Sequence, residues 1–192
     1  TEFAALGVPT DHRVSRFAEA FTVVRTLLAE GRVDFSGRFV MAREAELLPR
    51  PARPGGPPIL VGSNGPRMLA LTLPYANAWN SWYADTGNRP EGVAPLRALV
   101  DRVAVESGRD PASIERTVAV LVQLPGGAGR VMGDTDPRQA VAPLAGPPDV
   151  IAEGLRAYAR EGIGHVQLVV DPITTASVEA LSAVLEDLDR GP

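Results

Sequence analysis

The sequence contains no cysteine, no lysine and only two histidines, His12 and His165. A chain without cysteine forms no disulfide, has no thiolate nucleophile and binds no metal through sulfur. Two histidines far apart in the sequence do not suit a histidine-rich zinc site. We therefore expect no metal site. Because arginine supplies every basic side chain and Ala and Pro are abundant, the composition indicates a GC-rich bacterial genome.

Long apolar runs and basic clusters are also missing. No stretch approaches the ~20 apolar residues of a membrane helix, and the N-terminus lacks a basic segment followed by an apolar one. The net charge of −4 comes from interspersed charges, so no basic stripe is available for nucleic acid. With 192 residues, 45% of them apolar, the chain can bury a core, and we expect one domain over residues 1–192 in the cytoplasm.

The first 58 residues combine a helix with a β-hairpin pattern. Apolar residues at helical spacing predict an amphipathic helix over about residues 11–30, which Gly31 ends. Two short β-like pieces around Ser36 and Gly37 predict a hairpin, and a proline-rich connection follows. Residues 31–58 are therefore expected to form a hairpin and a proline-rich insertion.

Strand and helix patterns then alternate four times. The expected strands cover residues 59–61, 78–82, 117–124 and 165–170, and the expected helices cover 66–75, 93–107, a segment ending near 162, and 175–188. Runs dense in Val, Ile and Leu predict parallel strands buried on both faces. This pattern fits either a small doubly wound sheet or half of a (β/α)8 barrel.

A long Gly- and Pro-rich segment, residues 125–148, interrupts the third unit. It exceeds the ~12–15 residues usual for a loop in a compact domain, so we expect a mobile loop that is either a lid or a disordered segment.

A polar corner lies between the first of these strands and its helix. Gly62 lets a ligand approach the backbone, Ser63 and Asn64 offer side-chain donors, and free N–H groups near Gly65 and Arg67 add the positive end of a helix dipole. Such a corner suits a phosphate dianion. Ser and Asn are also common helix caps without any ligand, and that alternative stays open.

The strand over residues 78–82 carries two further candidates. Alternation along a strand places Asn80 and Trp82 on one face and Trp79 on the other. If Asn80 and Trp82 point into a barrel mouth, they contact a ring system or a substrate. Packing is the alternative for both tryptophans.

The remaining candidates are weaker. His165 starts its strand and is expected to be structural, whereas His12, near the start of the first helix, suits either the surface or the rim of a cofactor site. Asp171 precedes a proline at the end of the last strand and has no assigned role. The sequence identifies no catalytic acid or base.

Several motifs, in the same order, resemble the luciferase-like flavin-dependent oxidoreductases, including the branch that uses deazaflavin F420. The resemblance runs from Glu2 to about Asp189 and rests on EFAALGVPTDHRVSRFAEA (2–20), GRVDFSGRFV (31–40), ELLPRPARPGGPPILVGSNGPRML (46–69) and YAREGIGHVQL (158–168). It implies a TIM-type (β/α)8 barrel of which this chain contains only about the second half, strands five to eight. A complete barrel of this type has ~250 residues.

The resemblance also implies a function. Residues 62–65 match the position that receives the phosphate of FMN or F420, and the chemistry is hydride transfer or monooxygenation of a small organic substrate. Because four open strands would expose two edges, we expect either a fragment of a longer protein that lacks its N-terminal half-barrel or a chain that completes itself, as a homo-oligomer. The alternative is a non-catalytic half-barrel that acts as a cofactor-binding or assembly module.

Overall fold

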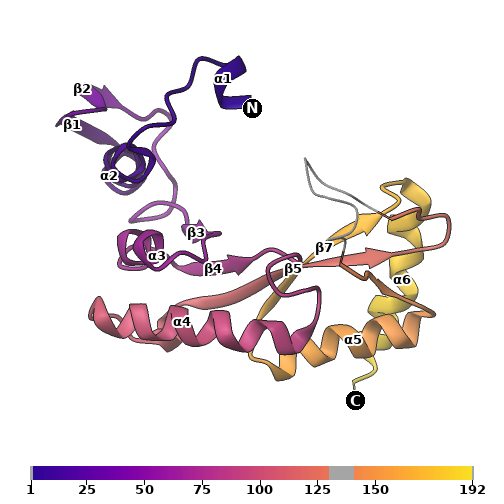
Figure 1. The fold of residues 1–192 in the computed structure, drawn as a ribbon. Helices are drawn as coiled ribbons and strands as arrows, with labels where there is room; N and C mark the ends of the chain where they lie inside the picture. Colours follow the sequence, from indigo (N-terminus) through magenta and orange to yellow (C-terminus); the bar gives the residue numbers. More distant parts are fainter. Residues whose placement is uncertain (1, 130–140, 192) are drawn as a thin grey trace. The chain divides into compact units, whose positions relative to one another are not determined.

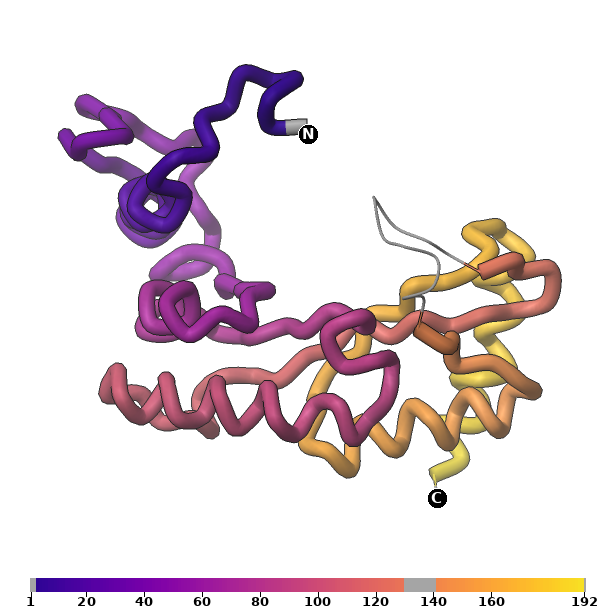
Figure 2. The backbone as a smooth tube through the Cα atoms, in the orientation of Figure 1, coloured from indigo at the N-terminus to yellow at the C-terminus, as the bar shows by residue number. Residues whose placement is uncertain are grey.

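The computed structural model describes residues 2–129 and 141–191, drawn as a ribbon in Figure 1 and as a backbone tube in Figure 2. The chain divides into two compact units, Thr1–Pro58 and Ile59–Pro192. The expectation of a single domain stays a prediction.

The first unit pairs a long helix with a two-stranded hairpin. Its elements are α1 (Glu2–Ala5), α2 (Arg13–Glu30), β1 (Arg32–Ser36) and β2 (Met41–Glu46). Gly31 ends α2 in the left-handed region at φ 73°, and its N–H donates to the carbonyl oxygen of Leu27. The antiparallel pairing of β1 with β2 confirms the predicted hairpin.

One carboxylate of α2 binds the hairpin turn. Glu19 accepts hydrogen bonds from the backbone N–H groups of Arg38, Phe39 and Val40 at 3.1, 2.7 and 2.9 Å. The Phe39 N–H group is the largest cause that lowers the pKa of Glu19, and the other two N–H groups and the Arg38 charge lower it further. Three donors on one carboxylate therefore connect α2 to the turn.

The second unit is a parallel sheet with four main strands and four α-helices (Figure 1). Its strands are β3 (Leu60–Val61), β4 (Ala78–Ser81), β5 (Glu115–Gln123), β6 (Leu144–Ala145) and β7 (His165–Asp171). Its helices are α3 (Pro66–Thr72), η1 (Pro90–Gly92), α4 (Val93–Glu106), η2 (Pro111–Ser113), α5 (Pro148–Arg160) and α6 (Thr175–Asp189). The order β3-β4-β5-β7 follows the chain, and every pair is parallel. The four predicted strand and helix units are confirmed.

The short strand β6 was not predicted, because it lies in the segment expected to be a loop. This strand forms because β5 is longer than β4. Since β4 ends at Ser81, opposite Val118, the rest of β5 needs other hydrogen-bond partners on that edge. The carboxamide of Asn88 bonds both the N–H and the carbonyl of Leu121, and β6 pairs with the last two residues of β5. Buried backbone groups are thereby satisfied. The middle of the expected mobile loop, residues 130–140, lies outside the described residues.

The sheet has two differently populated faces. Alternate side chains of β4, β5 and β7 pack against the helices in two apolar clusters, and Trp79, fully buried, belongs to the cluster with α3 and α4. Asn80 and Thr117 belong to neither cluster and share the opposite face, because they are register partners on adjacent parallel strands. We call this second face the inner face.

An arginine caps the end of α3. The Arg109 Nη1 group donates to the carbonyl oxygens of Leu73, Pro74 and Ala76 at 3.0, 3.1 and 3.3 Å, and its Nη2 group donates to Ser113. Carbonyl groups at a helix C-terminus lack partners within the helix, and a planar guanidinium can serve several at once. Arg109 therefore fixes the end of α3 and the connection to β4.

Candidate functional site

The polar corner lies at the carboxyl end of β3, where the chain enters α3. Gly65 is the N-cap of α3, with φ −87° and ψ 130°, and Pro66 occupies the first helical turn. No side chain makes a capping hydrogen bond there. Ser63 and Asn64 are thus not used as caps, so the usual structural reason for a Ser-Asn pair at a helix start does not apply.

The two glycines of the corner face open space. A Cβ atom on Gly62 would have its nearest neighbour, the Asn80 carbonyl oxygen, at 3.8 Å, and a Cβ on Gly65 would meet nothing within 4 Å. Neither glycine has a positive φ. Backbone conformation and packing among the described residues therefore do not require glycine at either position, and both leave the backbone accessible to a ligand.

Two side chains next to these glycines have unused capacity to bind. The Asn64 Oδ1 atom is buried and has no hydrogen-bond partner in the described structure. Arg67, in the first turn of α3, is exposed and forms no ion pair with any residue that the structure describes. A carboxamide and a guanidinium beside open backbone suit a group with several acceptor oxygens, such as a phosphate.

A buried tryptophan donates a hydrogen bond to the backbone of the corner. The indole Nε1 group of Trp79 donates to the carbonyl oxygen of Ser63 at 3.0 Å. Because Trp79 is completely buried, this hydrogen bond joins the corner to the packed interior of the second unit. The prediction that Trp79 lies on the face opposite Asn80 is confirmed.

Asn80 lies on β4, and Trp82 follows the last residue of that strand. The hydroxyl of Thr117 donates to Asn80 Oδ1 at 2.8 Å on the inner face. Trp82 is partly exposed and lines a hollow of about 290 Å³, and the centroid of its ring lies 4.5 Å from that of Tyr83, with the two rings tilted by 39°. The other residues lining this hollow come from the end of β7 and the start of α6, and they are Leu168, Val169, Val170, Ile173, Thr174 and Val178.

The other sequence candidates lie away from the corner. His165 begins β7 and is exposed, at the opposite end of the strand from the carboxyl edge. Asp171 ends β7, and its carboxylate accepts the N–H of Gly129 at 2.8 Å. His12 is the N-cap of α2, in the left-handed region, with its ring 5.4 Å from that of Phe39.

Among the described residues, the shifted pKa values identify no acid or base at the corner or on the inner face. Besides Glu19, the pKa of Glu153 is lowered, first by its hydrogen bond from Arg160. Burial raises the pKa of Tyr158 to about 12, and this residue belongs to the apolar cluster under the helices. The catalytic group therefore stays unassigned.

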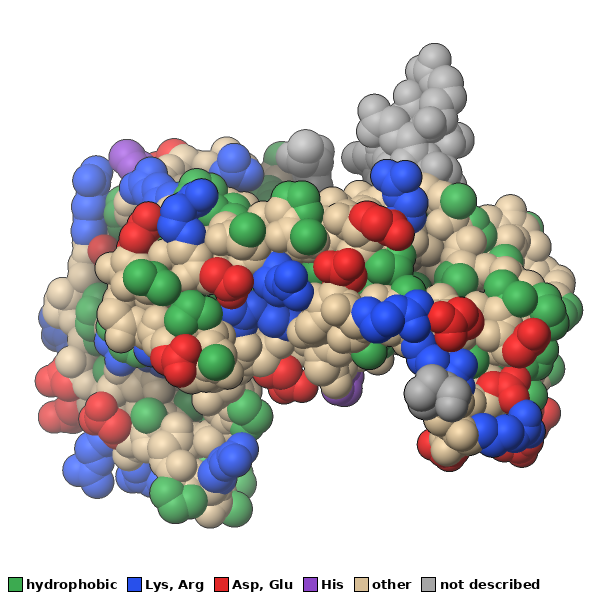
Figure 3. All heavy atoms as spheres, turned by 90° about the horizontal axis from the view of Figure 1, so that it is seen from below, with side chains coloured by type: hydrophobic (Ala, Val, Ile, Leu, Met, Phe, Trp, Pro, Cys, Tyr) green, Lys and Arg blue, Asp and Glu red, His purple; other side chains and the backbone are tan. Residues whose placement is uncertain are grey.

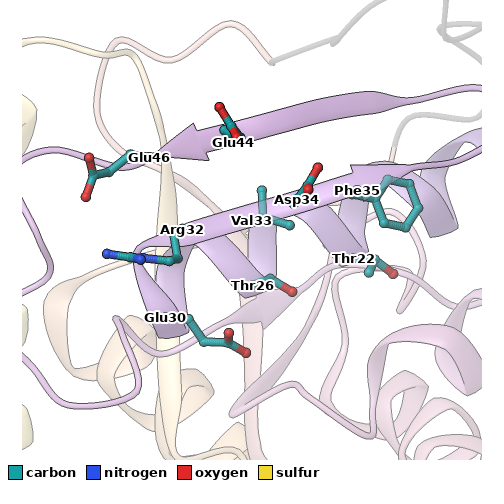
Figure 4. A pocket seen from close by; sticks show the side chains of 9 residues that line it. All are labelled: Thr22, Thr26, Glu30, Arg32, Val33, Asp34, Phe35, Glu44 and Glu46. Atoms are coloured by element: carbon teal, nitrogen blue, oxygen red, sulfur yellow. The ribbon is translucent and has the colours of Figure 1, made fainter.

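A second hollow, of about 690 Å³, lies in the first unit between α2 and the hairpin (Figure 4). Carboxylates dominate its lining, which consists of Thr22, Thr26, Glu30, Arg32, Val33, Asp34, Phe35, Glu44 and Glu46. Glu46 is engaged in an ion pair with Arg50. Within the described ranges, no group of three or more acidic or histidine side chains could hold a metal ion.

Acidic and basic side chains are interspersed on the face that Figure 3 shows. In the described part of the chain, no helix has the length and apolar character needed to span a bilayer.

Parallel strands covered by helices, with open backbone at a strand's carboxyl end, define an α/β protein of the kind that binds ligands at that edge. Comparison with known sequences gives the family: the luciferase-like monooxygenase family matches residues 1–126. The chain belongs to this family, and the matched region includes the corner and β4.

Two curated relatives come from mycobacteria. The chain is 31% identical over 102 residues to the F420-dependent hydroxymycolic acid dehydrogenase of Mycobacterium tuberculosis, covering 53% of this chain and 26% of the relative. It is 29% identical over 167 residues to the phthiodiolone/phenolphthiodiolone dimycocerosates ketoreductase of Mycobacterium bovis, covering 83% of this chain and 40% of the relative. The chain thus spans less than half the length of these relatives.

Solved structures show the same fold. An F420-dependent secondary alcohol dehydrogenase in complex with an F420-acetone adduct superposes with a TM-score of 0.74 at 16% identity, over 97% of this chain and 66% of that one. The monooxygenase RslO1 from Streptomyces bottropensis gives a TM-score of 0.73 at 20% identity, over 98% and 64%.

Three structural features could not be found by sequence reasoning. They are three hydrogen bonds: from Thr117 to Asn80, between the Asn88 carboxamide and the backbone of β5, and from the Trp79 indole to the Ser63 carbonyl oxygen. All three depend on strand register or tertiary contact. The only sequence signal was the polar Thr117 at the start of an otherwise apolar strand.

Proposed function

We propose that this chain is part of an oxidoreductase that uses F420 or FMN, and that residues 62–65 bind the phosphate group of that cofactor. The observation that carries the proposal is the open backbone at Gly62 and Gly65 beside the exposed guanidinium of Arg67, which can donate to phosphate oxygens. Family membership and the F420-dependent relatives support the choice of cofactor.

We also propose that β3, β4, β5 and β7 are strands five to eight of a (β/α)8 barrel. Their parallel order follows the chain, as in such a barrel, and each of the two outer strands has an unpaired edge in the described sheet. A preceding half-barrel or a second copy of the chain would complete the barrel. In either case the corner lies at the carboxyl ends of the strands.

The chain's own residues bind and orient the cofactor. Backbone N–H groups at the start of α3 and the charge of Arg67 attract the phosphate, Asn64 reorients its carboxamide to present Nδ2, and Trp79 keeps Ser63 in place. The bound deazaflavin or flavin supplies the redox chemistry. Asn80 and Trp82 extend the site into the mouth, as contacts to the ring system or the substrate.

The relatives favour hydride transfer over monooxygenation. Both curated matches carry names of enzymes that interconvert alcohols and ketones, and one is named as F420-dependent. We therefore propose hydride transfer between F420 and a carbonyl or alcohol group of a small organic substrate. Monooxygenation through reduced FMN is the second reaction, because monooxygenases share the fold.

Titration of the chain with F420, followed by absorbance, and with FMN, followed by fluorescence, tests the proposal. A Gly62→Val variant should fold normally, because the added side chain starts in open space, yet it should block the backbone from the phosphate. Ser63→Ala removes one donor and should cost on the order of 1 kcal/mol of binding free energy. Normal binding by a folded Gly62→Val variant would refute the phosphate site.

The second candidate is a non-catalytic half-barrel that binds the cofactor or assembles with a partner. The two unpaired strand edges motivate it, because an open parallel sheet favours association. Light scattering and turnover assays separate the two functions. Cofactor binding by an associated chain, without hydride transfer to any ketone in a panel, would favour the assembly module.

A further inference from the structure

We infer that Thr117 is a positioning residue that fixes the carboxamide of Asn80, so that Asn80 Nδ2 donates a hydrogen bond to an oxygen of the cofactor's phosphate-bearing polyol chain. The inference rests on the proposed function, since it needs the cofactor at residues 62–65. It gives the buried Thr117 a role, and it makes Asn80 a contact to the cofactor rather than to the substrate.

Thr117 is built into the sheet beside Asn80. The two residues are register partners on β5 and β4, so their side chains leave the same face of the sheet. Thr117 is only 2% exposed. Its hydroxyl lies 2.8 Å from Asn80 Oδ1 and 3.1 Å from the Trp79 carbonyl oxygen. A hydroxyl carries one proton, and the shorter contact assigns it to Asn80.

This contact determines which end of the carboxamide stays free. With Oδ1 accepting from Thr117, the Nδ2 group of the planar amide diverges from it and donates to no residue that the structure describes. The strand β3 borders β4 on the side opposite β5. Gly62 follows β3 there, and its open Cβ position is 3.8 Å from the Asn80 carbonyl oxygen. The residue that carries the free donor is therefore adjacent to the open backbone at Gly62.

The chemistry of the ligand suits such a donor. FMN and F420 share a polyol chain that carries a phosphate, and every heteroatom along this polyol is an oxygen that can accept a hydrogen bond. A donor whose orientation is fixed before binding loses little side-chain freedom when the ligand arrives. Without the Thr117 hydroxyl, the Asn80 amide loses the hydrogen bond that fixes Oδ1, so Nδ2 is no longer held toward the ligand before binding.

The experiment measures FMN affinity by fluorescence titration for the chain and four variants. Thr117→Val removes the hydroxyl at nearly constant volume, and Thr117→Ser restores it. We expect Thr117→Val to weaken FMN binding about three- to tenfold, Asn80→Ala to weaken it by a similar factor, and Thr117→Ser to stay within about twofold of the parent. Circular dichroism melts check that each variant folds.

The Thr117→Val, Asn80→Ala double variant distinguishes positioning from a structural role. If Thr117 acts through Asn80, the double variant binds FMN as well as Asn80→Ala alone. If Thr117 acts instead through the Trp79 carbonyl, the two losses multiply, which would overturn the inference.

A third comparison repeats the titrations with riboflavin, which lacks the phosphate group. A loss for FMN with no loss for riboflavin assigns the Asn80 donor to the phosphate, whereas equal losses assign it to a polyol hydroxyl, and both results support the inference. Parent-like FMN binding by Thr117→Val would overturn the inference alone. Absence of FMN and F420 binding by the parent chain would overturn the proposed function with it.

Discussion

Replacing Trp79 with phenylalanine tests how the corner is supported. The substitution removes the indole N–H that donates to the Ser63 carbonyl oxygen at 3.0 Å, and it also shrinks a completely buried side chain. Trp79 belongs to a buried apolar cluster with residues of β3, of α3 and its C-cap, and of α4, namely Val61, Leu69, Leu73, Val100, Val103 and Ala104.

The expected loss combines two contributions. A lost hydrogen bond to a backbone carbonyl costs about 1 kcal/mol. Truncation of a buried tryptophan to alanine costs about 3–5 kcal/mol, and since phenylalanine keeps one aromatic ring, we take about 1–2 kcal/mol for Trp79→Phe. The free energy of unfolding should therefore fall by about 2–3 kcal/mol. For a chain of this size, that lowers the melting temperature by roughly 4–12 °C.

Urea denaturation followed by circular dichroism measures this loss, and Trp82→Phe is the matched control. Trp82 is partly exposed and its indole N–H donates to no residue that the structure describes, so its replacement should cost less than about 1 kcal/mol. Trp79→Phe should also weaken FMN binding, because the Ser63 backbone is no longer fixed. Equal losses of stability in both variants would refute the anchoring role.

Two further predictions concern polar contacts outside the corner. Arg109→Lys should lower the melting temperature, because an ammonium cannot serve three carbonyls in the plane of a guanidinium, whereas the exposed Arg102→Lys should not; equal melts would contradict this. Because the pKa of Glu19 is lowered, its contribution to the free energy of unfolding is complete above the ordinary Glu pKa of 4.5. This contribution is lost as the pH falls through the lowered pKa. The protection of the Phe39 and Val40 amides from hydrogen exchange, relative to their intrinsic exchange rates, should fall in that window. Glu19→Gln should remove this pH-dependent change in protection, and a change that persists in the variant would assign it to another group.

The sequence predicted the succession of elements in the second unit because each element has a strong local signal. The strand β5 is an example. Its apolar run predicts a buried strand, and seven consecutive residues, Arg116–Val122, are buried. Helix boundaries were less accurate: α3 ends at Thr72 rather than near residue 75. Local patterns define the middle of an element better than its ends, where caps such as Arg109 act from a distance.

Features that depend on pairing could not be predicted. The strand β6 exists because β4 is shorter than β5, and no local pattern reports the difference in length between two strands. The corner was located from its Gly-Ser-Asn-Gly composition. The open space at its two glycines and the hydrogen bond from Trp79 depend on the tertiary structure, so the sequence could not predict them.

The central claim, that the corner binds a phosphate, is tested most directly by comparing FMN with riboflavin in the same titration. The two molecules differ only in the phosphate group. We expect that FMN binds more tightly than riboflavin, that added salt narrows this difference in affinity by screening Arg67 and the start of α3, and that Gly62→Val removes it. Equal affinity for FMN and riboflavin, unchanged in a folded Gly62→Val variant, would contradict a phosphate site at the corner.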